Sequence, residues 1–138
     1  MGEPVYLIDP IGRVESPLTD KSLAPSQGDE GAPEAVLVFR PAVAEGLSDL
    51  AVSTDVIVLT WLDRARRDEL STRPRDDPAQ PITGVFSTRS PDRPNPIGLH
   101  RVRIVSIDEL RVRVRNLEVL DGTPIVDVKP VLDLALER

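Results

Sequence analysis

Residues 99–115 read LHRVRIVSIDELRVRVR, and the alternation of apolar and charged side chains in this stretch decides the fold class. In its second half, Val112 and Val114 fall on one side of an extended chain, and the arginines around them fall on the other. The first half alternates in the same way. We therefore predict a hairpin with an apolar inner face and an arginine-rich outer face, formed by the strands Leu99–Ile107 and Arg111–Val119.

Further short strands are expected on both sides of this hairpin, separated by segments rich in Pro, Gly and Ser. The apolar, β-branched run Asp55–Leu62 predicts a buried central strand, and the pair Asp121-Gly122 predicts a tight turn before the last strand. The remaining expected strands are Val5–Ile8, Ile11–Val14, Ala35–Phe39, Thr83–Thr88 and Thr123–Val128. One or two short helical turns are expected, within Pro41–Leu50 and Asp63–Leu70. The pattern predicts an all-β barrel or sandwich with long loops.

The length and composition predict a single domain over residues 1–138 and exclude several function classes. The chain has no cysteine and one histidine, His100, which rules out a His/Cys zinc site and a cysteine nucleophile. Neither a P-loop nor a GxGxxG fingerprint occurs. The spacing of Asp121, Asp127 and Asp133 matches no calcium loop, so no metal is expected.

The same composition argues against a membrane partner and against secretion. No uninterrupted apolar run approaches the roughly 18 residues that a helix needs to cross a bilayer. The N-terminal residues, MGEPVYLIDP, have no basic segment followed by an apolar one, as a secretion signal would. The absence of cysteine fits a reducing compartment. We expect a cytoplasmic protein.

The net charge of −6 hides an uneven distribution of charge along the chain. Residues 61–115 carry 12 basic and 8 acidic side chains, a net charge of +4, and all 12 basic residues are arginines. The residues before and after this segment are net acidic. Guanidinium groups suit forked contacts with phosphates and carboxylates. The overall acidity nevertheless argues against strong, non-specific binding of a polyanion.

The segment before the hairpin, GVFSTRSPDRPNPIG (Gly84–Gly98), carries the strongest functional signal. Its three prolines restrict the backbone of their own and of the preceding residues, so the segment is stiff and non-helical. It holds Arg89, Arg93 and Asn95. A rigid loop with two guanidiniums and an amide suits ligand binding; a proline-rich turn with solvated arginines is the alternative.

No acid–base machinery stands out, which suits a reaction whose reagent is already activated. Methyl transfer from S-adenosylmethionine is one such reaction, because the protein then mainly aligns and desolvates the donor and the acceptor. His100, on a strand just after the proline-rich segment, is interpreted as structural rather than as a general base. These arguments permit methyl transfer without selecting it.

Four blocks of the sequence resemble the TsaA-like family, whose characterised members are TrmO-type tRNA methyltransferases. The residues that carry the resemblance are, in family order, IGRVESP (Ile11–Pro17), GLSDL (Gly46–Leu50), GVFSTRSPDRPNPIGL (Gly84–Leu99) and LEVLDGTPIVDVKP (Leu117–Pro130). The resemblance implies a small β-barrel that acts as a homodimer, with its cofactor near the subunit interface. It further implies S-adenosylmethionine as cofactor and, as substrate, the exocyclic nitrogen of threonylcarbamoyl-adenosine beside the tRNA anticodon.

The resemblance also implies roles for particular residues. The implied cofactor contacts are Pro25, Ser26 and Gln27 in the first long loop, Asp63 and Arg64 after the central strand, Arg89, Arg101, and the segment Leu117, Glu118, Val119 and Leu120. The candidate catalytic residues, which would shape the acceptor site or its scaffold, are Arg93, Asn95, Asp127 and Lys129. Asp121 matches a motif position of the same kind.

The chain departs from the family pattern at Ser26, Asp63 and Val131, and it ends after the predicted barrel. These departures leave open a module that binds S-adenosylmethionine without acting on tRNA, or a methyltransferase with a small-molecule acceptor.

Several side chains keep two interpretations. Arg89 contacts a ligand or forms a structural salt bridge, and Asn95 contacts substrate or stabilises its turn. Asp127 and Lys129 belong to the active site or form a surface ion pair. The outer face of the hairpin follows the phosphates of an anticodon stem or is simply the exterior of the barrel. Trp61 is interpreted as a core residue rather than as a platform for base stacking.

Overall fold

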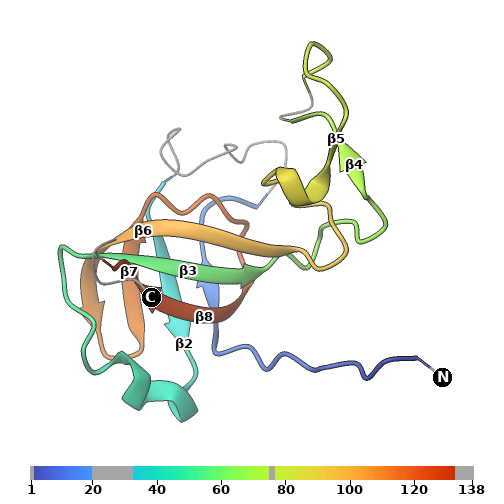
Figure 1. Cartoon of the computed structure of the whole chain (residues 1–138). Coiled ribbons are helices and arrows are strands. Elements are labelled where there is room, and N and C mark those ends of the chain that lie inside the picture. The colour runs from blue at the N-terminus through green and yellow to red at the C-terminus, as the bar shows by residue number, and fades with distance from the viewer. Residues whose placement is uncertain (1, 20–32, 75–76, 133–138) are drawn as a thin grey trace.

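Six antiparallel strands form a closed barrel in the computed structural model, which describes residues 2–19, 33–74 and 77–132 (Figure 1). The strands are, in chain order, β1 (Gly12–Glu15), β2 (Ala35–Phe39), β3 (Asp55–Trp61), β6 (Ile97–Asp108), β7 (Arg111–Arg115) and β8 (Pro124–Pro130). Their order around the barrel is β1-β2-β7-β6-β3-β8, and β8 pairs with β1 to close the sheet. The predicted all-β class is confirmed.

The β6–β7 hairpin is the predicted one. Asp108 pairs with Arg111 at its turn, and the ladder shifts register once, between Ile104 and Ser106. The expected alternation holds, because Val112 and Val114 are fully buried and the arginines beside them are exposed. Inward side chains of the other strands and of the segment after β7 fill the barrel with aliphatic groups. The chief ones are Val14, Leu37, Val58, Val102, Ile104, Leu117 and Ile125.

Two smaller units complete the fold. A 3-10 helix, η3 (Pro41–Leu47), follows β2, where one short helical turn was expected. Between β3 and β6, a two-stranded ribbon of β4 (Ser71–Thr72) and β5 (Thr83–Gly84) leads into a 3-10 turn, η5 (Val85–Ser87). This ribbon projects from the barrel (Figure 1). We call residues 62–96 the projection.

Of two predicted strands, one is wrong and the other is longer than the strand that forms. Val5–Ile8 is an exposed arm without a strand partner, and in Figure 1 it runs away from the barrel. Thr83–Thr88 is a strand only over Thr83–Gly84, since the N–H of Thr88 turns back to the carbonyl oxygen of Val85 at 3.1 Å. A local turn therefore replaces the expected ladder.

Three other expectations need correction. Arg111–Val119 stops being a strand at Arg115, because Asn116 adopts a left-handed φ of 72°. Asp63–Leu70 contains no helix, because the N–H of Arg66 bonds the Asp92 carboxylate at 2.9 Å instead of a carbonyl one turn earlier. The central strand β3 buries only one face, and its outward side chains are half-buried.

No helix among residues 2–19, 33–74 and 77–132 is long and apolar enough to cross a membrane.

Gly12 marks the closest approach of two strands and supplies a test of the packing. A Cβ atom at this position would overlap the carbonyl oxygen of Val38 in the neighbouring strand β2. We expect Gly12→Ala to lower the free energy of unfolding by roughly 1–3 kcal/mol, measured by urea denaturation. Gly46→Ala is the matched control, because no atom lies within 4 Å of a Cβ there. Equal effects of the two substitutions would contradict the close approach.

Candidate functional site

The proline-rich loop is bound to the chain segment that follows β3. The N–H of Leu62 donates to the carbonyl of Pro96 at 2.8 Å, and the N–H of Arg93 donates to the carbonyl of Arg66 at 3.0 Å. Further along, the N–H of Val85 bonds the carbonyl of Leu70 at 3.0 Å. These three bonds join the segment that leaves β3 to the segment that returns to β6, so the two segments of the projection stabilise each other.

Arg93, predicted as a candidate catalytic residue, lies inside this unit. Its half-buried guanidinium donates to the carbonyl oxygens of Val85 and Thr88, the second at 3.0 Å. Both carbonyls belong to the turn that replaces the expected strand. The bonds of Arg93 therefore hold this turn, and its predicted place in the acceptor site or its scaffold stays a prediction.

Arg67 fixes the tip of the loop, and the sequence analysis did not single it out. Its Nε donates to the carbonyl of Pro94 at 2.7 Å, and its Nη2 donates to Oδ1 of Asn95 at 2.9 Å. The same guanidinium lies 5.2 Å from the centre of the Trp61 ring, a cation–π distance. Trp61 is therefore a half-buried platform for Arg67 rather than the core residue predicted. The hydrogen bond between Arg67 and Asn95 joins residues 28 positions apart, so no local pattern in the sequence signals it.

The hydrogen bond from Arg67 involves Asn95 in its own turn, and a contact of Asn95 with substrate stays a prediction. Its side chain is exposed, and its Oδ1 accepts the Arg67 bond. The amide helps to define the turn, and it stands at the surface, where a ligand could reach it.

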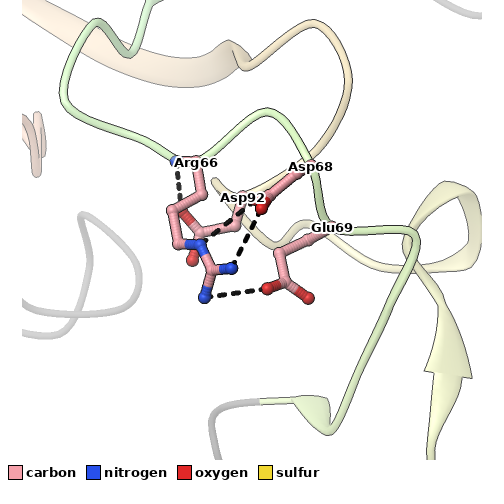
Figure 2. Close-up of polar contacts among 4 residues, drawn as sticks. All are labelled: Arg66, Asp68, Glu69 and Asp92. Atoms are coloured by element: carbon pink, nitrogen blue, oxygen red, sulfur yellow. Dashed lines mark hydrogen bonds and ion pairs between the residues drawn. The ribbon is translucent and has the colours of Figure 1, made fainter.

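Figure 2 shows a second guanidinium, Arg66, neutralised by neighbouring carboxylates. Its side chain bonds Asp68 at 3.1 Å and pairs with Glu69 at 2.9 Å, while its backbone N–H donates to Asp92. The bond from Arg66 lowers the pKa of the Asp68 carboxyl below its usual value. Arg66 is thus a structural residue of the turn that was expected to be helical.

Arg89 differs from Arg66, Arg67 and Arg93. It is exposed, on the loop between Thr88 and Ser90, and its side chain bonds no other residue in the described part of the chain. A ligand can therefore contact this guanidinium without breaking a hydrogen bond or ion pair between Arg89 and another described residue. This arrangement favours the ligand role over the structural salt bridge.

The described start of the first long loop, residues 16–19, contacts both Arg64, which follows β3, and Asp121, which follows the segment 117–120. The Arg64 guanidinium donates to the carbonyl of Thr19 at 3.3 Å, at the start of the first long loop. The N–H of Asp121 donates to the carbonyl of Leu18 at 2.7 Å, and the Asp121 carboxylate accepts the N–H of Ser16 at 3.0 Å. Asp63 is exposed beside Arg64. The calls on Pro25, Ser26 and Gln27 lie outside the described residues.

The segment Leu117–Leu120 lies against the barrel core immediately before Asp121. The side chains of Leu117 and Val119 are buried, and Glu118, between them, turns to His100. Glu118 Oε1 lies 2.7 Å from His100 Nδ1, and His100 Nε2 lies 2.7 Å from Thr60 Oγ1. His100 is buried, which agrees with its structural interpretation.

Arg101, Asp127 and Lys129 lie together elsewhere, on the outer surface of three adjacent strands. Arg101 and Lys129 both neighbour Ile57 of β3, from β6 and β8 respectively. Lys129 pairs with Asp127 at 3.1 Å, so the predicted surface ion pair is present. The described contacts do not join these three side chains to the proline-rich loop.

The five arginines of the hairpin face each meet a carboxylate. Arg101 and Arg103 share Asp55 at 2.9 and 2.7 Å, Arg111 pairs with Glu15 at 2.7 Å, and Arg113 and Arg115 lie 3.9 and 3.5 Å from Glu34. The bonds from Arg103 and Arg101 lower the pKa of the Asp55 carboxyl. The bond from Arg111 does the same to the pKa of Glu15. This compensation favours the interpretation of the face as the exterior of the barrel.

No group of three His, Asp or Glu side chains able to hold a metal ion occurs within the residues that the structure describes. The polar groups gathered near the end of β3 are guanidiniums, a carboxylate and backbone amides. Such a set suits an organic ligand that carries both a carboxylate and hydrogen-bond donors.

Comparison with known proteins decides the family. Residues 13–135 match the family described as the tRNA-methyltransferase O N-terminal domain. The chain belongs to this family. An S-adenosyl-L-methionine-binding protein of Archaeoglobus fulgidus is 40% identical over 123 residues, which are 89% of this chain and 87% of that protein. The predicted membership of the TsaA-like, TrmO-type family is confirmed.

Solved structures of the family share the fold. The crystal structure of TrmO from Pseudomonas aeruginosa superposes with a TM-score of 0.77 at 27% identity and covers 98% of this chain and 60% of that chain. A probable S-adenosyl-L-methionine-binding protein of Archaeoglobus fulgidus is 43% identical over 120 residues. The chain spans 32% of the length of that relative.

The contrast between Arg93 and Arg89 gives a test of the scaffold. We expect Arg93→Ala to speed amide hydrogen exchange at residues 85–90 by about tenfold or more, because two carbonyl bonds are lost. Arg89→Ala, the matched control four residues earlier, is expected to leave exchange in the same peptides unchanged. Mass spectrometry of exchanged peptides measures both. If exchange in the Arg93→Ala variant equals that of the wild type, Arg93 does not hold the turn.

Proposed function

We propose that this chain binds S-adenosylmethionine at the end of β3 and transfers its methyl group to the exocyclic nitrogen of threonylcarbamoyl-adenosine beside the tRNA anticodon. One observation carries the proposal: the start of the first long loop contacts both Arg64 and Asp121, through Arg64–Thr19 at 3.3 Å and Asp121–Leu18 at 2.7 Å. They are distant from one another in sequence. Their convergence supports a single cofactor site.

The residues present fit such a cofactor. Arg89 offers a free guanidinium for a carboxylate, and Glu118 offers a carboxylate to hydroxyl or amine donors. S-adenosylmethionine supplies an activated methyl group on a sulfonium, which leaves as a neutral thioether. The methyl group forms its new bond to the exocyclic nitrogen as its bond to sulfur breaks, and the N–H proton of that nitrogen is released to water. The chain therefore mainly needs to bind and orient the two reactants. The rigid projection, fixed by Arg67 and Arg93, supplies that orientation.

The charge of the projection supports a polyanionic acceptor. Arg66 is paired with Asp68 and Glu69, but the other bonded arginines of the projection donate to neutral carbonyl or amide oxygens, which do not cancel their positive charge. These arginines are Arg64, Arg67, Arg73 and Arg93. The hairpin arginines, in contrast, face carboxylates. We therefore place the proposed contact with tRNA phosphates on the projection and not on the hairpin face. A tRNA substrate would place the activity in the cytoplasm.

A second candidate is a module that binds S-adenosylmethionine without acting on tRNA. Two observations favour it: the net charge of −6 and the carboxylates opposite every hairpin arginine. The names of the Archaeoglobus fulgidus relatives also specify binding of S-adenosyl-L-methionine alone. A methyltransferase with a small-molecule acceptor fits the same cofactor site.

Methyl-transfer assays separate these candidates. Wild-type protein is incubated with methyl-labelled S-adenosylmethionine and with tRNA that either carries or lacks threonylcarbamoyl-adenosine. We expect label only in the modified tRNA. Arg89→Ala should weaken cofactor binding at least tenfold by calorimetry, since a charge-assisted contact is lost, and should keep the thermal midpoint.

Each other outcome has a definite meaning. Cofactor binding without labelled RNA selects the binding module or the small-molecule enzyme. Absence of cofactor binding by the wild type overturns the proposed site. Unchanged affinity in Arg89→Ala removes that arginine from it.

We further propose that the active form is a homodimer, with the cofactor site near the interface. On the outside of the barrel, Leu59 pairs with Leu99 and Trp61 pairs with Ile97, which forms an apolar patch at the end of β3. Leu99 is 48% exposed and Ile97 is 42% exposed. This patch adjoins Asp63 and Arg64. A second copy covering it would lie beside the cofactor residues.

The dimer is tested by light scattering coupled to size-exclusion chromatography. We expect the wild type to have the mass of a dimer at about 100 µM and Leu99→Glu to have the mass of a monomer, because a charge would be buried in the interface. Val52→Glu is the control, since Val52 is also about half exposed (51%) but lies in the turn before β3. A monomeric wild type, or a dimeric Leu99→Glu variant, would refute this interface.

A further inference from the structure

A buried chain of three polar side chains connects the barrel core to the proposed cofactor site. Thr60 of β3 is fully buried, His100 of β6 is 6% exposed, and the Glu118 side chain is 17% exposed. The imidazole stands between the other two, with 2.7 Å on each side. Polar groups at this depth are costly unless every one is bonded. The imidazole is bonded at both of its nitrogens.

The partners of the imidazole fix where its proton sits. An ionised carboxylate only accepts hydrogen bonds, so Nδ1 of His100 carries a hydrogen toward Glu118. Nε2 then accepts the hydroxyl hydrogen of Thr60, or donates to its oxygen if the ring is protonated. Nδ1 donates to Glu118 in both protonation states. The hydrogen bond from His100 to Glu118 therefore does not depend on whether the ring is protonated.

The imidazole of His100 packs against the backbone of β6 at Gly98. A Cβ atom at Gly98 would overlap both Thr60 Oγ1 and His100 Nε2, so the ring and the hydroxyl fill the space above this glycine. The position of His100 is therefore imposed by close packing as well as by its two hydrogen bonds.

Glu118 is the end of the chain that can reach a ligand. Its neighbours Leu117 and Val119 are buried in the core, which fixes the backbone on either side. Within the described residues, His100 supplies the one hydrogen bond to its carboxylate. The second carboxylate oxygen remains available to a hydroxyl or amine donor, and S-adenosylmethionine carries both kinds.

We propose that His100 is a positioning residue for the cofactor: by donating from Nδ1 it orients the Glu118 carboxylate toward a hydroxyl or amine of S-adenosylmethionine and so sets the affinity. This inference rests on the proposed function of the site. The sequence analysis assigned His100 a purely structural role, and the bond to Glu118 extends that role to the site.

Two substitutions at His100 separate positioning from packing. Asn places an amide near the position of Nδ1 and can still donate to Glu118, whereas Gln places its amide near Nε2 and keeps the contact with Thr60. We expect His100→Gln to weaken S-adenosylmethionine binding about tenfold by calorimetry, which is the loss of one charge-assisted bond. His100→Asn should restore most of that affinity.

The coupling to Glu118 is measured directly with a double-mutant cycle. Glu118→Gln should weaken binding, and His100→Gln added to it should cause little further loss, because the two residues act through one contact. If the two losses add fully, the residues act separately and the proposal fails. If both His100 variants lose only thermal stability and keep the affinity of the wild type, the role is structural.

A readout that needs no variant comes from the single histidine of the chain. Its imidazole nitrogens give one unambiguous set of signals in a long-range ¹H–¹⁵N spectrum of the wild type. We expect the Nδ1–H form before ligand is added and a shift of the Nδ1 signal on saturation with S-adenosylmethionine. An unmoved signal at saturation would overturn the proposal even if the variants do not fold.

These outcomes also distinguish this proposal from the function on which it rests. A wild-type protein that binds no S-adenosylmethionine refutes the proposed function. A wild type that binds it, with His100→Gln binding equally well, refutes only the role of His100.

Discussion

Closure of the barrel is the constraint on which the rest of the structure depends. Strand β3 pairs with β6 on one side and β8 on the other, so its last residue, Trp61, has a fixed place at one end of the barrel. The chain leaves from there into the projection and returns at Ile97. Because both ends of the projection belong to paired strands, a proline-rich loop without regular structure holds a defined orientation relative to the core.

Arginine has two different uses on the two parts of the molecule. On the barrel, Arg101, Arg103 and Arg111 pair with carboxylates across neighbouring strands, an arrangement that favours solubility and register. On the projection, Arg67 and Arg93 donate to carbonyl oxygens. These bonds stabilise the loop, and because the acceptors are neutral the positive charge of each arginine is not cancelled. The sequence alone shows twelve arginines in one region, and only the fold separates the two groups.

Periodicity predicted the barrel strands well, whereas Arg64 and Thr19, which meet after β3, lie outside the four family blocks. The hairpin follows from alternation alone, because its inner and outer positions differ so sharply in polarity. The projection could not be predicted in the same way. Its turn at Val85 depends on a guanidinium eight residues later, and the contact of Arg67 with Asn95 spans 28 residues. Such bonds leave no local pattern in a sequence.

The glycine beneath the lone imidazole has an evolutionary consequence. Gly98, Thr60 and His100 occupy one small volume, so a larger residue at position 98 is incompatible with the present ring and hydroxyl. A lineage opens space at 98 only when both the imidazole of His100 and the hydroxyl of Thr60 are replaced or moved, whereas one that first enlarges 98 must displace both. The order in which these three positions can mutate is therefore restricted, and their histories are tied together.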